Sequence, residues 1–230
     1  MNAMILAAGR GERMRPLTDH CPKPLLTVGG QTLLDWHLAR LAAGPFSRVV
    51  INTAWMGAAI RDHVARYAPP ALDVVISDEG GEGLETAGGI VRALPLLGPE
   101  PFIVINGDVW TDLDPSMLPT APEGLGHLIL VDNPPHHPRG DFHFDGYALS
   151  PDGEWPRYTF AGIACYRSEL FAGLGDGFAP LAPILARACA RRQLTGHYHD
   201  GIWRDIGTPA RLRALDAELS ARQGGRPAPQ

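Results

Sequence analysis

The sequence predicts an α/β fold, a doubly wound and mostly parallel sheet with a small antiparallel β insertion in the second half of the chain. Two observations carry this prediction. Short apolar runs alternate with helical patterns over the first half of the 230 residues, which is the order of βαβ units. From Gly126 onward, short alternating stretches are broken by proline, glycine and aspartate, which is typical of antiparallel strands.

The first apolar run, Ala3 to Ala8, predicts a strand that ends at a charged, glycine-rich loop. Gly9 and Gly11 let backbone N–H groups approach an anion without an intervening Cβ. Three arginines of the loop add guanidinium groups suited to phosphate oxygens, Arg10, Arg13 and Arg15. The loop therefore suits a polyphosphate, although two glycines by themselves are more typical of a surface turn.

Helices and strands then alternate. Thr32 and Asp35 form a capping-box pattern that begins a helix, and Gly44 ends it. Ligands of such sheets bind outside the carboxyl ends of the strands, where the glycine-rich loop is expected. The remaining predicted elements of this half are strands over Val49–Asn52, Asp73–Ser77 and Phe102–Asn106, a helix striped by Ile60, Val64 and Tyr67, and a helix that begins near Thr86.

The second half is expected to hold the antiparallel insertion and to close with helices. Its predicted elements are strands over His127–Asp132, Phe142–Phe144, Tyr147–Leu149, Tyr158–Phe160, Gly162–Tyr166 and Thr195–His199, and a helix over Leu181–Arg192. Thr208 is the expected N-cap of a last helix, because Pro209 then occupies its first position. Residues 1–222 are predicted to form one domain, and the Gly- and Pro-rich residues 223–230 a disordered tail.

The composition of the chain limits the classes of molecule that it is expected to bind. With 45% hydrophobic residues, one domain can bury a large core. The net charge of −5 and the absence of a Lys/Arg-rich run disfavour nucleic acid and anionic membranes as partners. The three cysteines lack metal or disulfide spacing, and no secretory leader or membrane span is seen. The chain is expected to be cytoplasmic, to act on small molecules and plausibly to be a monomer.

Lys23 is the only lysine in the chain, and the other positively charged side chains are all arginines. It stands between two prolines, Pro22 and Pro24, which stiffen its backbone. A single compact ammonium in an arginine-rich sequence indicates that a point charge is needed there. The alternative is a solvated surface lysine.

Two aspartates are candidate ligands of a hard cation. Asp108 directly follows the apolar strand that ends at Asn106, so its carboxylate is expected at the carboxyl edge of the sheet. An aspartate in that position is also a common turn former. Asp205 precedes a Gly-Thr-Pro helix start, but Thr208 is the better cap, which leaves the Asp205 carboxylate available for another role.

The stretch LAAGRGERMRPLT, followed by PKP, resembles the signature of the sugar-1-phosphate nucleotidyltransferases. The resemblance implies an α/β nucleotide-binding fold, a nucleoside triphosphate and a sugar 1-phosphate as substrates, Mg²⁺, and pyrophosphate as leaving group. It implies catalytic roles for Lys23, Arg13 and Asp108, and metal binding by Asp108 and Asp205. The nucleotide-binding residues that it implies are Ala8, Gly9, Gly11, Glu12, Arg13, Lys23, Ala87 and Gly88.

The base-binding part departs from the family pattern. Many members carry a glutamine shortly before the glycine-rich turn, and it reads a pyrimidine edge. This chain offers three glutamates there instead, Glu79, Glu82 and Glu85. The identity of the base therefore follows less directly than the binding of a nucleotide.

The loop NPPHHPRGDF, with INGDVWTD upstream, resembles one subfamily, the N-acetylmuramate 1-phosphate uridylyltransferases of cell-wall recycling. That resemblance implies UTP as donor and contacts from Asn106 and Asp141 to the sugar phosphate. Other members use a second lysine for the sugar phosphate; this chain has none, and Arg139 or the metal is expected to replace it. Adjacent histidines rarely face one ion, so no histidine metal site is predicted at His136 and His137.

Two alternatives stay open. The nearer is another enzyme of the same class, such as a mannose-1-phosphate guanylyltransferase, which shares the opening motif. The more distant is a catalytically silent, nucleotide-binding regulatory subunit. The presence of Lys23, Asp108 and Asp205 together disfavours the silent subunit.

Overall fold

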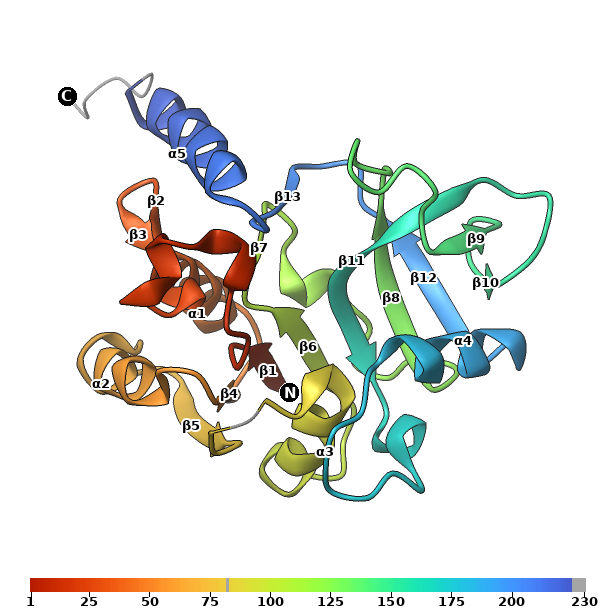
Figure 1. Ribbon diagram of the computed structural model, residues 1–230. Helices are drawn as coiled ribbons and strands as arrows, with labels where there is room; N and C mark the ends of the chain where they lie inside the picture. Colours follow the sequence, from red (N-terminus) through yellow and green to blue (C-terminus); the bar gives the residue numbers. More distant parts are fainter. Residues whose placement is uncertain (82, 225–230) are drawn as a thin grey trace.

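The computed structural model describes residues 1–81 and 83–224, and within this part nine strands join in one mixed sheet (Figure 1). Its parallel half has the order β6-β1-β4-β5, which confirms the predicted doubly wound arrangement. These four strands are β1 (Asn2–Leu6), β4 (Arg48–Thr53), β5 (Asp73–Asp78) and β6 (Phe102–Asn106).

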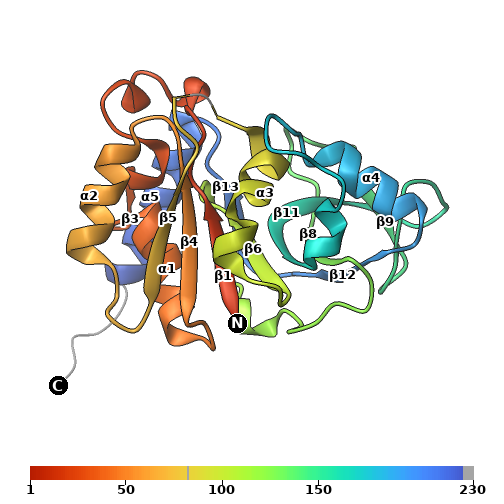
Figure 2. The same cartoon turned by 90° about the horizontal axis from the view of Figure 1, so that it is seen from below.

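Successive side chains of each strand point to opposite faces of the sheet, so the parallel strands feed two separate cores. Ala3 and Ile5 of β1 belong to the core beneath α1 (Leu33–Ala43) and α2 (Gly57–Tyr67). Met4, between them, belongs to the core beneath α3 (Glu85–Leu97) on the other face. Figure 2 shows α1 and α2 on one side of the parallel strands and α3 on the other. The near-continuous apolar runs of the sequence follow from this two-sided burial.

The antiparallel strands extend the same sheet. β11 (Arg157–Tyr166) pairs with β6 and carries β8 (Gly126–Val131), and β12 (Leu194–Tyr198) pairs parallel with β8. The two strands predicted over 158–160 and 162–166 are one strand, whose register against β8 shifts between Phe160 and Ala164. The smaller elements are β9 (Phe142–Phe144), β10 (Leu149–Ser150) and α4 (Ala182–Ala190).

The predicted last helix is α5 (Pro209–Gly224), which packs next to the loops that follow β1. Several short elements were not predicted, among them strand β13 (Trp203–Asp205), which pairs antiparallel with β7 (Val109–Thr111). Thr208 Oγ1 accepts a hydrogen bond from Arg211 N at 3.3 Å, which confirms it as the cap of α5. The others are β2 (Thr27–Val28), β3 (Gln31–Thr32) and the 3₁₀ turns η1 (Glu12–Met14), η2 (Leu17–Asp19), η3 (Lys23–Leu25), η4 (Pro115–Met117) and η5 (Ser168–Phe171).

Of the tail predicted over 223–230, residues 225–230 lie outside the described residues, and 223–224 still belong to α5. Glu82 also lies outside the described residues. None of the helices in the described ranges has the length and apolar character needed to cross a bilayer.

The capping box at the start of α1 yields a stability prediction. Thr32 Oγ1 accepts from Asp35 N at 3.0 Å, and Asp35 Oδ2 accepts from Thr32 N at 3.4 Å. We expect Thr32→Ala to lower the free energy of unfolding by about 1 kcal/mol, because the backbone N–H of Asp35 loses its acceptor at the start of the helix. Urea denaturation measures the loss, with the exposed Thr27→Ala as control. Equal midpoints for both variants would contradict the assignment.

His37 in α1 yields a pH prediction. Its side chain is buried, and burial lowers its pKa to about 4, with Arg40 adding to the shift while Asp108 and the backbone of Val109 and Gly107 oppose it. The unfolded chain takes up this proton near pH 6.5 and the folded chain only near pH 4, so stability falls as the pH drops between these values.

We expect the loss attributable to His37 to approach about 3 kcal/mol at the lower end of this window. Urea denaturation at pH 7 and pH 5 should show a smaller loss in His37→Leu than in the wild type. Identical pH dependence of the two proteins would show that His37 is not the buried neutral group.

Candidate active site

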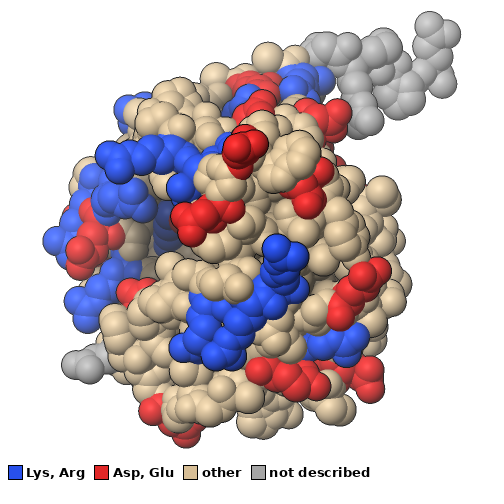
Figure 3. Space-filling model, turned by 90° about the vertical axis from the view of Figure 1, so that its right-hand side faces the viewer, with Lys and Arg blue, Asp and Glu red and all other residues tan. Residues whose placement is uncertain are grey.

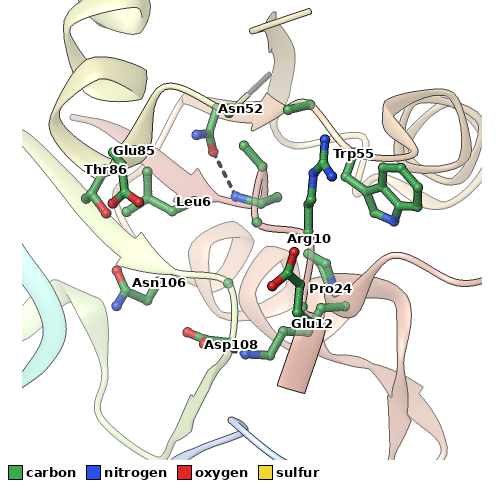
Figure 4. A pocket seen from close by; sticks show the side chains of 18 of the residues that line it. Leu6, Arg10, Glu12, Pro24, Asn52, Trp55, Glu85, Thr86, Asn106 and Asp108 are labelled. Atoms are coloured by element: carbon green, nitrogen blue, oxygen red, sulfur yellow. Dashed lines mark hydrogen bonds and ion pairs between the residues drawn. The ribbon is translucent and has the colours of Figure 1, made fainter. Parts of the chain in front are cut away.

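A pocket of about 730 Å³ opens at the carboxyl ends of the parallel strands (Figure 4). It is bordered by the loop after β1, the ends of β4 and β5, the start of α3 and the turn after β6. This is the edge at which the sequence predicted a ligand site. The predicted site residues that line it are Ala8, Gly9, Gly11, Glu12, Arg13, Lys23, Asn106 and Asp108.

The glycine-rich loop turns sharply at Gly11. Its φ is 64°, in the left-handed region, and a Cβ there would lie 2.9 Å from Thr18 Cγ2 and 3.3 Å from Lys23 Cβ. Thr18 Oγ1 donates to Gly11 O at 2.8 Å and ties the turn to the segment that carries the lysine. Glycine is therefore required at position 11 for both conformation and space.

Lys23 and Asp108 form the ion pair at the base of the pocket. Lys23 Nζ lies 2.5 Å from Asp108 Oδ2, and the two side chains are 12% and 35% exposed. The residues are 85 positions apart in the chain. The only lysine therefore reaches the carboxylate that follows β6, and a surface position for it is wrong.

The pocket holds two further cationic side chains, Arg10 and Arg13. Within the described residues, neither Arg10 nor Arg13 forms an ion pair or hydrogen bond through its guanidinium group, whereas Arg15 pairs with Asp19. Figure 3 shows Lys and Arg side chains gathered around a hollow in one face of the molecule. Positive charge without a partner at the rim of a pocket favours an anionic occupant.

A chain of buried hydrogen bonds, which sequence reasoning missed, holds the opposite wall. Asn52 Oδ1 accepts from Ala7 N at 2.7 Å, and Asn52 Nδ2 donates to Glu79 Oε1 at 2.6 Å. Glu79 Oε2 accepts from Leu84 N at 2.8 Å. The ends of β1, β4 and β5 and the start of α3 are thereby joined. Polar residues that end apolar runs, as in VVIN and VVISDE, are the signal for these two side chains.

The predicted base-binding residues lie behind the pocket wall. Ala87 N and Gly88 N both donate to Ala179 O, at 3.0 and 3.1 Å, so the chain itself occupies these two N–H groups. The neighbouring Glu85 and Thr86 line the pocket instead. Glu85 has a φ of 62°, a conformation that non-glycine residues adopt at a cost and that is concentrated at functional sites.

Asn106 and Asp141, the two expected contacts of the sugar phosphate, differ in position. Asn106 lines the pocket and packs against Gly162, whose φ is 73°; a Cβ on Gly162 would lie 2.4 Å from Asn106 Nδ2. Asp141 does not line this pocket. Its carboxylate accepts from Phe160 N at 2.8 Å and lies 3.0 Å from His137 Nε2. Asp141 therefore orders the loop before β9 in this structure.

The backbones of the two candidate metal ligands, Asp108 and Asp205, lie close together, but their carboxylates have different partners. Ile206 N donates to Asp108 O at 2.7 Å, and β7 and β13 set Asp205 opposite Val109. Yet the Asp205 carboxylate pairs with Arg211 Nη1 and lies 3.3 Å from His136 Nε2, beside a second cavity of about 600 Å³. Within residues 1–81 and 83–224, no three His, Cys, Asp or Glu side chains are grouped as a metal site.

The chemical type of the two candidate ligands, Asp108 and Asp205, suits Mg²⁺. Both candidates are carboxylates, which hard cations prefer, and their backbones lie side by side at the edge of the pocket. Each carboxylate is neutralised by a basic group of the chain in this structure, Asp108 by Lys23 and Asp205 by Arg211.

Comparison with known proteins gives relatives along the whole chain. The chain is 47% identical over 234 residues to the N-acetylmuramate alpha-1-phosphate uridylyltransferase of Neisseria meningitidis serogroup B, covering 96% of this chain and 99% of that protein. It is 34% identical to the protein of the same name from Caulobacter vibrioides, covering 95% and 96%.

Solved structures share the fold at low sequence identity. The inositol-1-phosphate CTP transferase of T. maritima superposes with a TM-score of 0.78 at 16% identity, covering 99% of this chain and 98% of that one. The UDP-glucose pyrophosphorylase of Acinetobacter baumanii gives 0.78 at 14% identity, covering 97% and 96%. The family model described as the MobA-like NTP transferase domain matches residues 3–120, which hold the glycine-rich loop, Lys23 and Asp108. The chain is a nucleotidyltransferase and belongs to the MobA-like NTP transferase family.

Proposed function

We propose that this chain transfers a uridylyl group from UTP to N-acetylmuramic acid 1-phosphate, giving UDP-N-acetylmuramic acid and pyrophosphate. The observation that carries the proposal is 47% identity over nearly the full length of both chains to an N-acetylmuramate alpha-1-phosphate uridylyltransferase. The pocket at the sheet edge supports a polyphosphate substrate independently of that name, because it holds the Lys23–Asp108 pair and two arginines, Arg10 and Arg13, that form no ion pair within the described part of the chain. Both substrates are small molecules, consistent with the net charge of −5.

The reaction is an in-line displacement at phosphorus. A non-bridging oxygen of the sugar 1-phosphate attacks the α-phosphorus of UTP and forms a new P–O bond. The bond from the α-phosphorus to the oxygen that bridges to the β-phosphorus breaks, and pyrophosphate leaves with that electron pair. The nucleophile is already anionic, so no general base is needed, and the barrier comes from bringing two anions together.

The chain's own cations address that barrier. We assign Lys23 to neutralise phosphate charge, and Arg13 and the Gly9–Gly11 backbone to hold the triphosphate and the leaving pyrophosphate. Asp108 orients Lys23 through their 2.5 Å contact. Ala8 and Glu12, which belong to the same loop and line the pocket, complete the proposed nucleotide site. Lys23 is held by Asp108 before substrate arrives, so this charge needs little reorganisation during the reaction.

Asp108 and Asp205 would hold Mg²⁺, which supplies Lewis-acid neutralisation of the phosphate oxygens when bound. Asp205 must then exchange its Arg211 partner for the cation. Asn106 and Asp141 are the proposed contacts of the sugar phosphate, and Asn106 already lines the pocket. Ala87 and Gly88 are the proposed contacts of the base, which requires the segment at Ala179 to release their N–H groups.

We expect Lys23→Ala to lower turnover by about 10²–10³-fold, because a preorganised charge opposite the developing negative charge is lost. Asp108 is 35% exposed, so water can solvate it and the fold should survive, which far-UV circular dichroism checks. Arg66→Ala, an exposed charge removal in α2, is the control and should retain full turnover. Near-normal turnover of Lys23→Ala would remove the lysine from the mechanism.

The choice of substrates is tested by pyrophosphate release from the purified protein. UTP and GTP are crossed with N-acetylmuramic acid 1-phosphate and mannose 1-phosphate, in the presence of Mg²⁺ and in the presence of a chelator. We expect rapid release only with UTP, the muramic acid derivative and Mg²⁺ together. Preference for GTP and mannose 1-phosphate would favour the guanylyltransferase alternative, and no release with any pair would favour the silent subunit.

A further inference from the structure

A second cavity of about 600 Å³ lies next to the active-site pocket, and the proposed reaction places no part of a substrate in it. Its walls come from the ends of β8 and β12, from β13 and from the first turns of α5. The chain crosses from β12 through β13 to α5 along this side of the molecule (Figure 1). Asp205 lines the second cavity and Gly207, two residues later, lines the first, so the two cavities meet at this segment.

The side chain of Arg211 lies at this meeting point. Arg211 lines the second cavity, and its guanidinium packs against the backbone of Gly207. A Cβ on Gly207 would lie 3.1 Å from Arg211 Nη2 and 3.2 Å from Arg211 Cζ, closer than ordinary van der Waals contact. Because glycine has no Cβ, the guanidinium can come this close to the wall of the active-site pocket. A positive charge therefore lies at the boundary of the two cavities.

The guanidinium of Arg211 is held through one of its nitrogens. Nη1 pairs with the Asp205 carboxylate and lies 3.0 Å from His136 Nε2. Nη2 and Nε have no hydrogen-bond partner among residues 1–81 and 83–224. These two nitrogens form one edge of the planar fork, which matches the two oxygens of a carboxylate. With Nη1 held and only 27% of the side chain exposed, this edge has a restricted orientation before a ligand binds.

Arg204, the other arginine that lines the second cavity, has partners for both of its terminal nitrogens. Its Nη2 lies 3.1 Å from Glu218 Oε2, and its Nη1 donates to Trp203 O at 2.9 Å. The arginine of this cavity that remains available to an anion is therefore Arg211.

The remaining walls of the second cavity suit a sugar derivative with a single negative charge. Val131, Trp203 and Leu215 contribute apolar surface, and the carboxylates of Asp132 and Asp200 can accept hydrogen bonds from hydroxyl groups. The same carboxylates repel a polyphosphate, which carries several negative charges. One available guanidinium among such side chains fits a ligand that combines hydroxyls with one carboxylate.

The proposed acceptor carries two anionic groups at different carbons of its sugar ring. One is the phosphate, whose proposed contact Asn106 lines the active-site pocket. The other is the carboxylate of the lactyl ether. N-acetylglucosamine 1-phosphate has a hydroxyl in place of this ether and is otherwise the same. An enzyme that binds both anionic groups at once needs two anion sites that are close but separate, and Arg211, at the boundary of the two cavities, meets this need.

We propose that Arg211 binds the lactyl carboxylate of N-acetylmuramic acid 1-phosphate at the second cavity and so selects this acceptor over sugar phosphates that lack the carboxylate. The inference rests on the proposed function and deepens it, since it names a residue that determines acceptor specificity. The exchange proposed for Asp205 removes the present counter-ion of Arg211, which strengthens the attraction of the guanidinium for the carboxylate.

Isothermal titration calorimetry with N-acetylmuramic acid 1-phosphate and N-acetylglucosamine 1-phosphate tests this inference. Mg²⁺ is present with a UTP analogue whose α- and β-phosphates are joined by a methylene group, so that no transfer occurs. We expect the wild type to prefer the muramic acid derivative about tenfold and Arg211→Ala to lose this preference, because a charge-assisted pair is removed. Arg211→Lys, which keeps the charge but not the planar fork, should show an intermediate preference. Arg204→Ala removes the paired arginine of the same cavity and should keep the full preference.

A third acceptor separates recognition from a structural role of Arg211. In it, a neutral carboxamide of nearly the same shape replaces the lactyl carboxylate. The wild type should bind this amide about tenfold more weakly than the acid, whereas Arg211→Ala should bind the two equally, because the carboxylate and the guanidinium are coupled to each other. A wild type without preference for the acid, or a tenfold preference kept in Arg211→Ala, would overturn the inference. A wild type that neither binds the muramic acid derivative nor transfers a uridylyl group to it would instead overturn the proposed function.

Discussion

The site depends on the position of β1 between β4 and β6. All three strands run parallel, and Leu6 at the end of β1 is paired with Asn52 of β4 and with Asn106 of β6. The segments that follow the three strands therefore start at one level of one edge. The glycine-rich loop, Trp55 and Asp108 meet there although they come from positions far apart in the sequence. This register determines where the pocket lies, and the loops that follow the strands supply the side chains that line it.

The local patterns of the sequence were sufficient for the parallel half. Burial on both faces produces the long apolar runs, and the Thr32–Asp35 and Thr208–Pro209 signals mark helix starts that the structure reproduces. These signals depend on residues within four positions of one another. The same reasoning failed for β7 and β13, two three-residue strands about 90 positions apart with no periodicity, whose pairing follows only from the packing of the whole chain.

In the candidate site, too, features encoded by neighbouring residues could be predicted, whereas features that depend on long-range packing could not. The positions of the loop after β1 and of Asp108 at the sheet edge could be predicted, because each directly follows an apolar strand in the sequence. The contact of Lys23 with Asp108 depends on tertiary folding, and the Asn52–Glu79 hydrogen bond joins two strand ends that no local motif connects. For Asp205, the sequence identified an aspartate freed from capping but could not reveal Arg211 and His136 as its partners. Competing partners of a carboxylate are decided by long-range packing.

The solitary lysine has a practical chemical consequence. Because no other residue of the chain bears an ε-amine, Lys23 is the only side chain that can form an imine with an aldehyde. Its amine sits in the pocket with only 12% of the side chain exposed. A nucleotide whose ribose has been oxidised to a dialdehyde would thus be trapped by reduction at one side chain of known location. Among its side chains the protein therefore has one attachment site for reporters of pocket occupancy, and the other primary amine is the α-amine of Met1, which donates to Pro45 O.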